Sequence, residues 1–271
     1  MRGAVSLGGV AVTVPAPDPA PVIVGVGIDD VMARAAERIA AVLTDAVAAR
    51  GVATMALAGG NTPQRLYRLL AAPPYALSIP WGRVRLFLGD ERWVPADHPD
   101  SNAHMVRELL LAGLPEAPAF FPMPTDAADP AEAAHRYHEC LVREVPAEAG
   151  RAVPRLDLVL LGMGDDGHTA SLFPGTPALD AAEPVAAVFV PRLDSWRLSL
   201  TLPVLNAARH VLFLVTGADK AATLARVLGD GARRTLPASL VRPADGELEW
   251  HVDREAAALL AGSPPGPESR A

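Results

Sequence analysis

Several features that mark large classes of proteins are scarce in this chain of 271 residues. Its single cysteine, Cys140, cannot form an internal disulfide and indicates no oxidising compartment. It has one lysine, Lys220, and a formal net charge of −7, so no basic patch indicates nucleic-acid binding. No apolar run is long enough to span a membrane, and the N-terminus, with only Arg2, has no secretory signal. We therefore expect a cytoplasmic protein that binds neither membranes nor nucleic acid.

Hydrophobic residues, by contrast, make up 50% of the chain, which is enough to bury a sizeable core. Apolar segments that alternate with helical patterns predict strands at 22–26, 54–58, 84–89, 156–161, 185–190, 197–202, 210–216 and 248–252. This alternation predicts an α/β fold with a mostly parallel, doubly wound sheet and helices on both faces, a Rossmann-like three-layer arrangement. We expect one domain at 22–261, a flexible Pro-rich arm at 1–21 and a disordered tail at 262–271.

The most informative stretch is 156–175, which reads LDLVLLGMGDDGHTASLFPG. Its first six residues, apolar except for Asp157, are typical of a strand buried on both faces. Three glycines then follow, interleaved with Asp165, Asp166 and His168. Because parallel α/β folds bind their ligands at the carboxyl ends of the strands, this loop is a candidate for chemistry.

A second glycine loop, at residues 59–62, follows the predicted strand 54–58. Gly59 and Gly60 would let the backbone approach a ligand closely, and the helix expected after Asn61 and Thr62 would direct free N–H groups to the same point. We expect Thr62 to cap this helix. The pattern predicts a phosphate site, and the alternative is an ordinary tight turn between a strand and a helix.

The segment 162–167 matches the dinucleotide-binding pattern G-x-G-x-x-G, but we reject that interpretation. Asp165 and Asp166 would repel a pyrophosphate, and Pro174 leaves too little room for the helix that the pattern requires. We therefore predict no nicotinamide or flavin cofactor.

A divalent metal site could be drawn from carboxylates at 90, 91, 165 and 166 together with His168. The chain has H-x-x-H spacing only at His135 and His138, which fit a solvated helix face better than a metal site. We therefore predict no metal.

His168 is a candidate general base. It follows a glycine after a buried strand, and the acids two and three residues before it could fix its tautomer. From spacing alone, Asp165 and Asp166 are equal candidates for that partner, and a purely structural histidine is the alternative. Arg92, Arg197 and Lys220, each near a predicted strand end, are the cations available to an anion. Ser171 lacks the G-x-S-x-G surroundings of a nucleophile, so we interpret it as a polar loop residue.

Together these segments resemble the 6-phosphogluconolactonases, which are related to the glucosamine-6-phosphate deaminases and isomerases. The resemblance covers about 22–260 and keeps the family's order. It rests on LAGGNTP at 57–63, LGDERWVP at 88–95, SN at 101–102, GMGDDGHTASLFPG at 162–175, RLSLT at 197–201, TGADKA at 216–221 and PASLVRP at 237–243.

The resemblance implies hydrolysis of 6-phospho-D-glucono-1,5-lactone to 6-phospho-D-gluconate in the oxidative pentose phosphate pathway, without a cofactor. It also implies residue roles. The loop 59–62, with Arg197 and Lys220, would hold the phosphate, and His168 would take a proton from the attacking water. Asp166 would orient the imidazole, Arg92 would stabilise the developing oxyanion, and Asp90 would lie nearby. We expect a monomer, with a homodimer as the alternative.

Two other functions remain open at this stage. One is a glucosamine-6-phosphate deaminase or isomerase, in which the resemblance implies a glutamate for proton transfer where this chain has Phe173. A phenyl ring cannot relay a proton, which favours the lactonase. The other is a non-enzymatic sugar-phosphate sensor, against which the presence of His168 and Arg92 counts.

Overall fold

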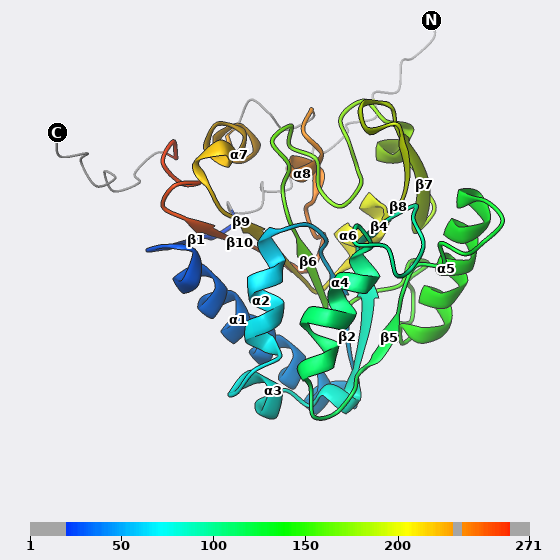
Figure 1. Ribbon diagram of the computed structural model, residues 1–271, viewed down its shortest axis with the longest axis horizontal. Helices are drawn as coiled ribbons and strands as arrows, with labels where there is room; N and C mark the ends of the chain where they lie inside the picture. The colour runs from blue at the N-terminus through cyan, green and yellow to red at the C-terminus, as the bar shows by residue number, and fades with distance from the viewer. Residues whose placement is uncertain (1–19, 230–234, 261–271) are drawn as a thin grey trace, which may run out of the picture.

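The computed structural model describes residues 20–229 and 235–260, so nearly all of the predicted arm and the whole predicted tail lie outside it. A seven-stranded sheet, in which every pair of neighbours is parallel, runs through the molecule in the order β1-β10-β9-β6-β2-β3-β5 (Figure 1). Its strands are β1 (Val22–Gly25), β2 (Ala53–Leu57), β3 (Val84–Leu88), β5 (Ala119–Phe121), β6 (Leu158–Leu161), β9 (His210–Val215) and β10 (Glu247–Asp253). This sheet confirms the predicted α/β class.

A second, three-stranded antiparallel sheet has the order β4-β8-β7. It consists of β4 (Asp90–Arg92), β7 (Val185–Val190) and β8 (Ser195–Leu200), and it packs against α5 (Pro130–Glu144). In Figure 1 this small sheet lies to the right of β6. The sequence pattern predicted β7 and β8 but neither β4 nor a separate sheet.

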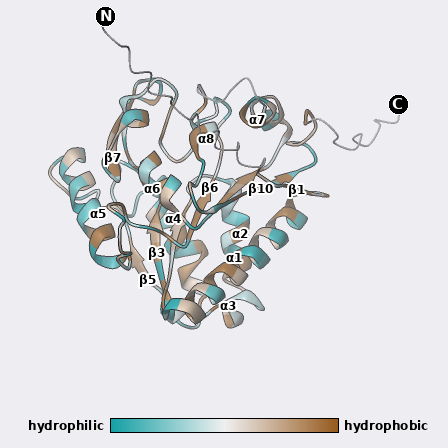
Figure 2. Cartoon of the chain, turned by 180° about the vertical axis from the view of Figure 1, so that it is seen from behind, coloured by the Kyte–Doolittle hydropathy of each residue, from teal (hydrophilic) through white to brown (hydrophobic). Residues whose placement is uncertain are grey.

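The longest helix, α1 (Ile28–Arg50), packs against β1, β2, β6, β9 and β10. The other α-helices are α2 (Thr62–Leu70), α3 (Tyr75–Ser78), α4 (Asn102–Leu109), α6 (Leu202–Ala207), α7 (Ala221–Leu228) and α8 (Pro237–Leu240). Figure 2 shows hydrophobic strands enclosed by helices of mixed polarity, as expected for buried parallel strands. Among the described residues, no helix combines the length and apolar character needed to cross a membrane.

The two sheets are joined at Gly89, between β3 and β4. Its N–H donates to the carbonyl of Leu57 in β2 at 2.8 Å, and its carbonyl accepts from the N–H of Leu200 in β8 at 2.8 Å. One residue is therefore hydrogen-bonded to both sheets. This junction brings β4 to the carboxyl ends of β2 and β3, which is where the loops of the large sheet gather.

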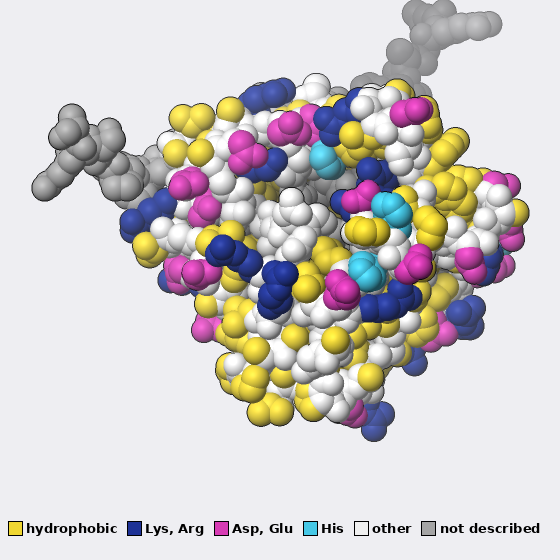
Figure 3. All heavy atoms as spheres, in the orientation of Figure 1, with side chains coloured by type: hydrophobic (Ala, Val, Ile, Leu, Met, Phe, Trp, Pro, Cys, Tyr) yellow, Lys and Arg dark blue, Asp and Glu magenta, His cyan; other side chains and the backbone are white. Residues whose placement is uncertain are grey.

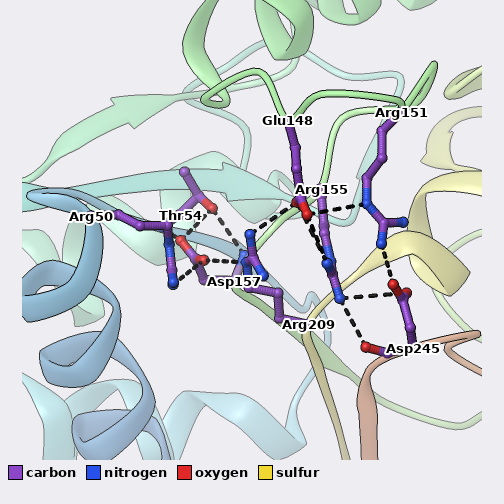
Figure 4. Close-up of polar contacts among 8 residues, drawn as sticks. All are labelled: Arg50, Thr54, Glu148, Arg151, Arg155, Asp157, Arg209 and Asp245. Carbon is purple, nitrogen blue, oxygen red and sulfur yellow. Dashed lines mark hydrogen bonds and ion pairs between the residues drawn. The ribbon is translucent and has the colours of Figure 1, made fainter.

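At the amino ends of the central strands of the large sheet, the buried carboxylate of Asp157 holds the start of β6 in place (Figure 4). Asp157 accepts hydrogen bonds from the backbone N–H and the hydroxyl of Thr54 at 2.8 and 2.9 Å. It also pairs with Arg50 at 2.6 Å and with Arg209 at 3.3 Å. Three segments distant in sequence, around residues 50–54, 157 and 209, thus meet at one side chain, which is only 6% exposed. We interpret this cluster as structural, because the described acids and arginines are paired with one another.

Candidate active site

A cavity of about 480 Å³ lies at the carboxyl ends of β2, β3, β6 and β9. Figure 3 shows a hollow on this face of the molecule, with histidine, lysine and arginine side chains near its rim. Nine of the ten predicted site residues line the cavity: Gly59, Gly60, Asn61, Thr62, Asp90, Arg92, His168, Arg197 and Lys220. The tenth, Asp166, lies behind the imidazole of His168. Segments that are distant in sequence therefore converge at one place.

The loop between β2 and α2 forms one wall of the cavity. Gly60 has φ +88°, a left-handed conformation that favours glycine. A Cβ at Gly59 would overlap the side-chain amide of Asn102, so only glycine fits there. Asn61, not Thr62, precedes the helix, and neither side chain caps it. The prediction that Thr62 is the N-cap was therefore wrong, because the Gly-Gly turn lets the helix begin one residue earlier. The residues at this end of the helix line the cavity, and a helix N-terminus is a favourable place for an anion.

Two arginines from neighbouring strands of the small sheet line the same cavity. Arg92 of β4 and Arg197 of β8 are directly opposite in the antiparallel register. Burial, and then the positive charge of Arg92, lowers the pKa of Arg197 from its ordinary value. The Nε of Arg197 is buried and has no hydrogen-bond partner within the described part of the chain. Two like charges brought together beside an unpartnered donor are expected where an anion binds.

Lys220 adds a third cation from the loop after β9. Its Nζ lies 3.1 Å from Asp219 Oδ2, and both residues line the cavity. The loop begins at Gly217, whose φ of +100° favours glycine and whose N–H donates to both oxygens of Asp253 at 3.1 Å. The buried Asp253 at the end of β10 thereby fixes the loop that carries Lys220.

The loop after β6 holds His168 in a defined orientation. Asp166 Oδ1 lies 2.6 Å from the ring Nδ1 and accepts from the His168 backbone N–H at 3.0 Å. Although burial opposes the shift, hydrogen bonds from His168 and the charge of Arg192 hold the pKa of Asp166 below its usual range. In the tautomer in which Nδ1–H donates to Asp166, the lone pair is on Nε2, as a general base requires. Of the two candidate acids, Asp166 is the partner of the ring.

Backbone hydrogen bonds close a tight turn around His168. Gly164 donates its N–H to the carbonyl of His168 at 2.9 Å, and Gly167 donates to Gly164 at 3.1 Å. A Cβ at Gly164 would overlap the imidazole. No helix follows within 162–176. Gly164 and Gly167 therefore allow the tight turn that places the His168 side chain.

Asp90 and Glu91 are adjacent in β4 but have different surroundings. Asp90 lines the cavity and accepts from the hydroxyl of Ser171 at 2.7 Å. Glu91 points to the start of α4, where it accepts from Ser101 Oγ and from the backbone N–H groups of Asn102 and Ala103. Burial raises the pKa of Glu91, and these hydrogen bonds offset part of the rise. Glu91 is thus a structural acid, and Ser171, which sequence reasoning treated as a loop residue, positions Asp90.

Within the described ranges, one group of side chains has the spacing of metal ligands, namely Asp165, Asp166 and His168. The ring Nδ1 already faces Asp166 Oδ1, and Arg192 Nη2 lies 2.9 Å from Asp166 Oδ2. A guanidinium at this distance repels a divalent cation. The donor set therefore fits a hydrogen-bonded acid–base pair better than a metal ion.

Sequence reasoning missed Arg192, which precedes β8 and lines the cavity beside His168. Besides its ion pair with Asp166, its guanidinium lies 4.9 Å from the ring centroid of Phe173. That ring in turn stacks on the imidazole at 4.2 Å. The segment around Arg192 carries no glycine or motif, so only the pairing of β7 with β8 could have placed it here.

Comparisons with known proteins find a matching family model and several similar proteins. Residues 28–250 match the family model described as glucosamine-6-phosphate isomerases/6-phosphogluconolactonase. The 6-phosphogluconolactonase of Synechocystis is 45% identical over 218 residues, which is 79% of this chain and 87% of that protein. The human 6-phosphogluconolactonase is 41% identical over 216 residues, or 78% and 82% of the two chains. The solved 6-phosphogluconolactonase of Trypanosoma brucei superposes with a TM-score of 0.79 at 33% identity, over 89% of this chain and 99% of that one.

Proposed function

The chain belongs to the family of glucosamine-6-phosphate isomerases and 6-phosphogluconolactonases, and we propose that it hydrolyses 6-phospho-D-glucono-1,5-lactone to 6-phospho-D-gluconate. The observation that carries this proposal is one cavity with an anion cradle on one side and a His–Asp pair on the other. Its volume of about 480 Å³ is within the range of small-molecule sites. The reaction belongs to the oxidative pentose phosphate pathway.

The phosphate end of the substrate is assigned to the start of α2 together with Arg197 and Lys220. The helix supplies N–H groups and the favourable end of its dipole, and the two cations supply charge. The unpartnered Nε of Arg197 is the donor best explained by a bound anion. These contacts hold the substrate alike before and during the reaction, so they set binding more than turnover.

The reacting end is assigned to His168. Nε2 accepts a proton from a water molecule as its oxygen attacks the lactone carbonyl carbon C1. Asp166 stabilises the imidazolium that forms. When the C1–O5 bond of the tetrahedral intermediate breaks, the same proton passes to the ring oxygen, and the product carries a carboxyl group and a free hydroxyl. No metal or organic cofactor is needed to balance this step.

Two further residues complete the proposal. Arg92, whose cross-strand neighbour is Arg197, adds positive charge to the cavity, and we assign it to the oxyanion that develops at C1. Asp90 is held by Ser171 and faces the cavity, where its remaining lone pairs can accept a sugar hydroxyl. All of these groups come from a single chain, so a monomer carries the whole site.

The deaminase alternative requires a proton-transferring side chain at the position of Phe173. Phe173 is buried and its ring stacks on His168 at 4.2 Å, so no proton-transferring group occupies that position. The structural feature that tells the two chemistries apart is therefore an apolar surface against the imidazole.

The direct test measures proton release at constant pH from freshly prepared 6-phosphogluconolactone, because hydrolysis creates an acid. We expect the wild-type protein to exceed the spontaneous rate by orders of magnitude and to release no ammonia from glucosamine 6-phosphate. His168→Ala should lose most of this activity, about 10²–10⁴-fold. His135→Ala, on the exposed face of α5, is the matched control and should retain it. A wild-type rate equal to the spontaneous rate contradicts the proposal.

A further inference from the structure

We propose that Arg192 is a positioning residue for the His168–Asp166 pair, an inference that rests on the proposed function. Arg192 lies in the turn Pro191–Leu193 between β7 and β8, on the small sheet. The pair that it contacts lies in the loop after β6 of the large sheet. The acid–base centre is therefore assembled from both sheets, and Arg192 is the residue of the small sheet that contacts Asp166.

Both carboxylate oxygens of Asp166 are held in place. Its Oδ1 engages both the ring Nδ1 and the backbone N–H of His168, at 2.6 and 3.0 Å. Its Oδ2 is engaged by Arg192 Nη2 at 2.9 Å. A carboxylate with both oxygens bound cannot turn about its χ2 torsion without breaking a charge-assisted hydrogen bond. Arg192 therefore keeps Oδ1 directed at Nδ1, which keeps the lone pair on Nε2.

Both His168 and Arg192 pack against the ring of Phe173. The imidazole stacks on this ring with centroids 4.2 Å apart and planes inclined by 27°. The guanidinium of Arg192 lies 4.9 Å from the same centroid. A cation over an aromatic face is attracted to it, so the ring stabilises Arg192 in the place from which it reaches Asp166. Phe173 thus packs against His168 and also against Arg192, which in turn holds Asp166.

Arg192 differs from Arg197, another arginine of the cavity, in its contacts. The guanidinium of Arg192 is committed to Asp166 and Phe173, although its side chain is 47% exposed. Arg197, by contrast, keeps a buried Nε without a partner in the described chain and is available to a ligand. Loss of Arg192 should therefore reduce turnover, whereas loss of Arg197 should weaken substrate binding.

The test compares Arg192→Gln and Arg192→Lys with Arg34→Gln. Arg34 is the matched control, because its side chain is 51% exposed and it pairs with Asp30 at 3.0 Å, outside the cavity lining. We expect Arg192→Gln to lower kcat about 10- to 100-fold with KM within about threefold, as for a misplaced catalytic group. Lysine should recover part of the loss, because it keeps the charge but not the planar fork. The control should keep wild-type kcat.

A second readout does not depend on turnover. The 15N shifts of the His168 ring, assigned by comparison with His168→Gln, report which nitrogen carries the proton without any substrate. We expect the Nδ1–H form in the wild type and a mixture with Nε2–H in Arg192→Gln. An unchanged ring spectrum overturns the proposal, as does a variant in which KM rises and kcat is unchanged. If the wild type fails to hydrolyse the lactone, the proposed function fails, and the ring spectra still decide the role of Arg192.

Discussion

Gly164→Ala is the sharpest test of the site, because it adds one methyl group against the imidazole and removes no functional group. Gly164 does not have a positive φ, so alanine is compatible with its backbone. A Cβ built there would overlap Nδ1 of His168 and would lie 2.8 Å from Asp166 Oδ1. The Cβ would lie 2.0 Å from Nδ1, so contact at 3.4 Å requires the ring to move by about 1.4 Å, and a displacement of even about 1 Å costs about 10²-fold in rate. We therefore expect kcat to fall about 100-fold, which corresponds to about 2.7 kcal/mol of transition-state stabilisation.

The assay is proton release from 6-phosphogluconolactone, together with calorimetric titration of 6-phosphogluconate. Binding of this product should be retained, because the loop 59–62 and Arg197 are unchanged. Gly27→Ala serves as the control, since a Cβ at Gly27 has nothing within 4 Å and the residue is outside the cavity lining. A Gly164→Ala variant that keeps wild-type kcat, although its ring spectrum shows that the His168 imidazole is displaced, would contradict this prediction. The position of the ring would then have no part in turnover.

Three further outcomes are expected. Arg197→Ala should raise KM about 10- to 100-fold with little change in kcat, since a charge-assisted hydrogen bond contributes about 1.5–3 kcal/mol; steady-state kinetics decide this, and a fall in kcat alone would contradict it. Asp157→Ala should destabilise the fold by about 3 kcal/mol, because it leaves two arginines without their buried partner. Calorimetry should show a Tm about 6–12 °C lower, whereas Asp126→Ala, at an 82% exposed side chain, should change it little. Activity should survive EDTA, because Arg192 neutralises the carboxylate that a metal would need; a loss that a divalent ion restores would revive the metal interpretation.

The sequence predicted those parts of the molecule that depend on local patterns. The apolar run before Gly162 marked a buried strand, and it is buried throughout. Glycines after β2 and β6 marked these loops as candidate sites, and Gly59 lies against the side chain of Asn102 and Gly164 against that of His168. The expected approach of the loop 59–62 to a ligand stays a prediction. Because parallel strands end at one edge, these separate loops could be expected to meet there, and they line one cavity.

What the sequence did not reveal depends on pairing between distant segments. The strand β4 has only three residues, too few for a periodic pattern, and it exists because β8 pairs with it. Arg192 carries no local signal and reaches Asp166 through the turn between β7 and β8. The choice between Asp165 and Asp166 depended on the loop's backbone geometry, which spacing does not specify. The prediction of Thr62 as the N-cap was wrong, because the start of the helix depends on the conformation of the preceding glycine turn, which the sequence pattern does not specify.

The pairing of β1 with β10 has a consequence for synthesis on the ribosome. β1 forms an edge of the large sheet, and its partner is the last strand of the described chain. About 230 residues separate the two strands, so at a synthesis rate of roughly 5–20 residues per second β10 is made on the order of 10–45 s after β1. During that interval the nascent chain exposes an unpaired β-branched segment, which is where a chaperone that recognises extended apolar peptides would bind it.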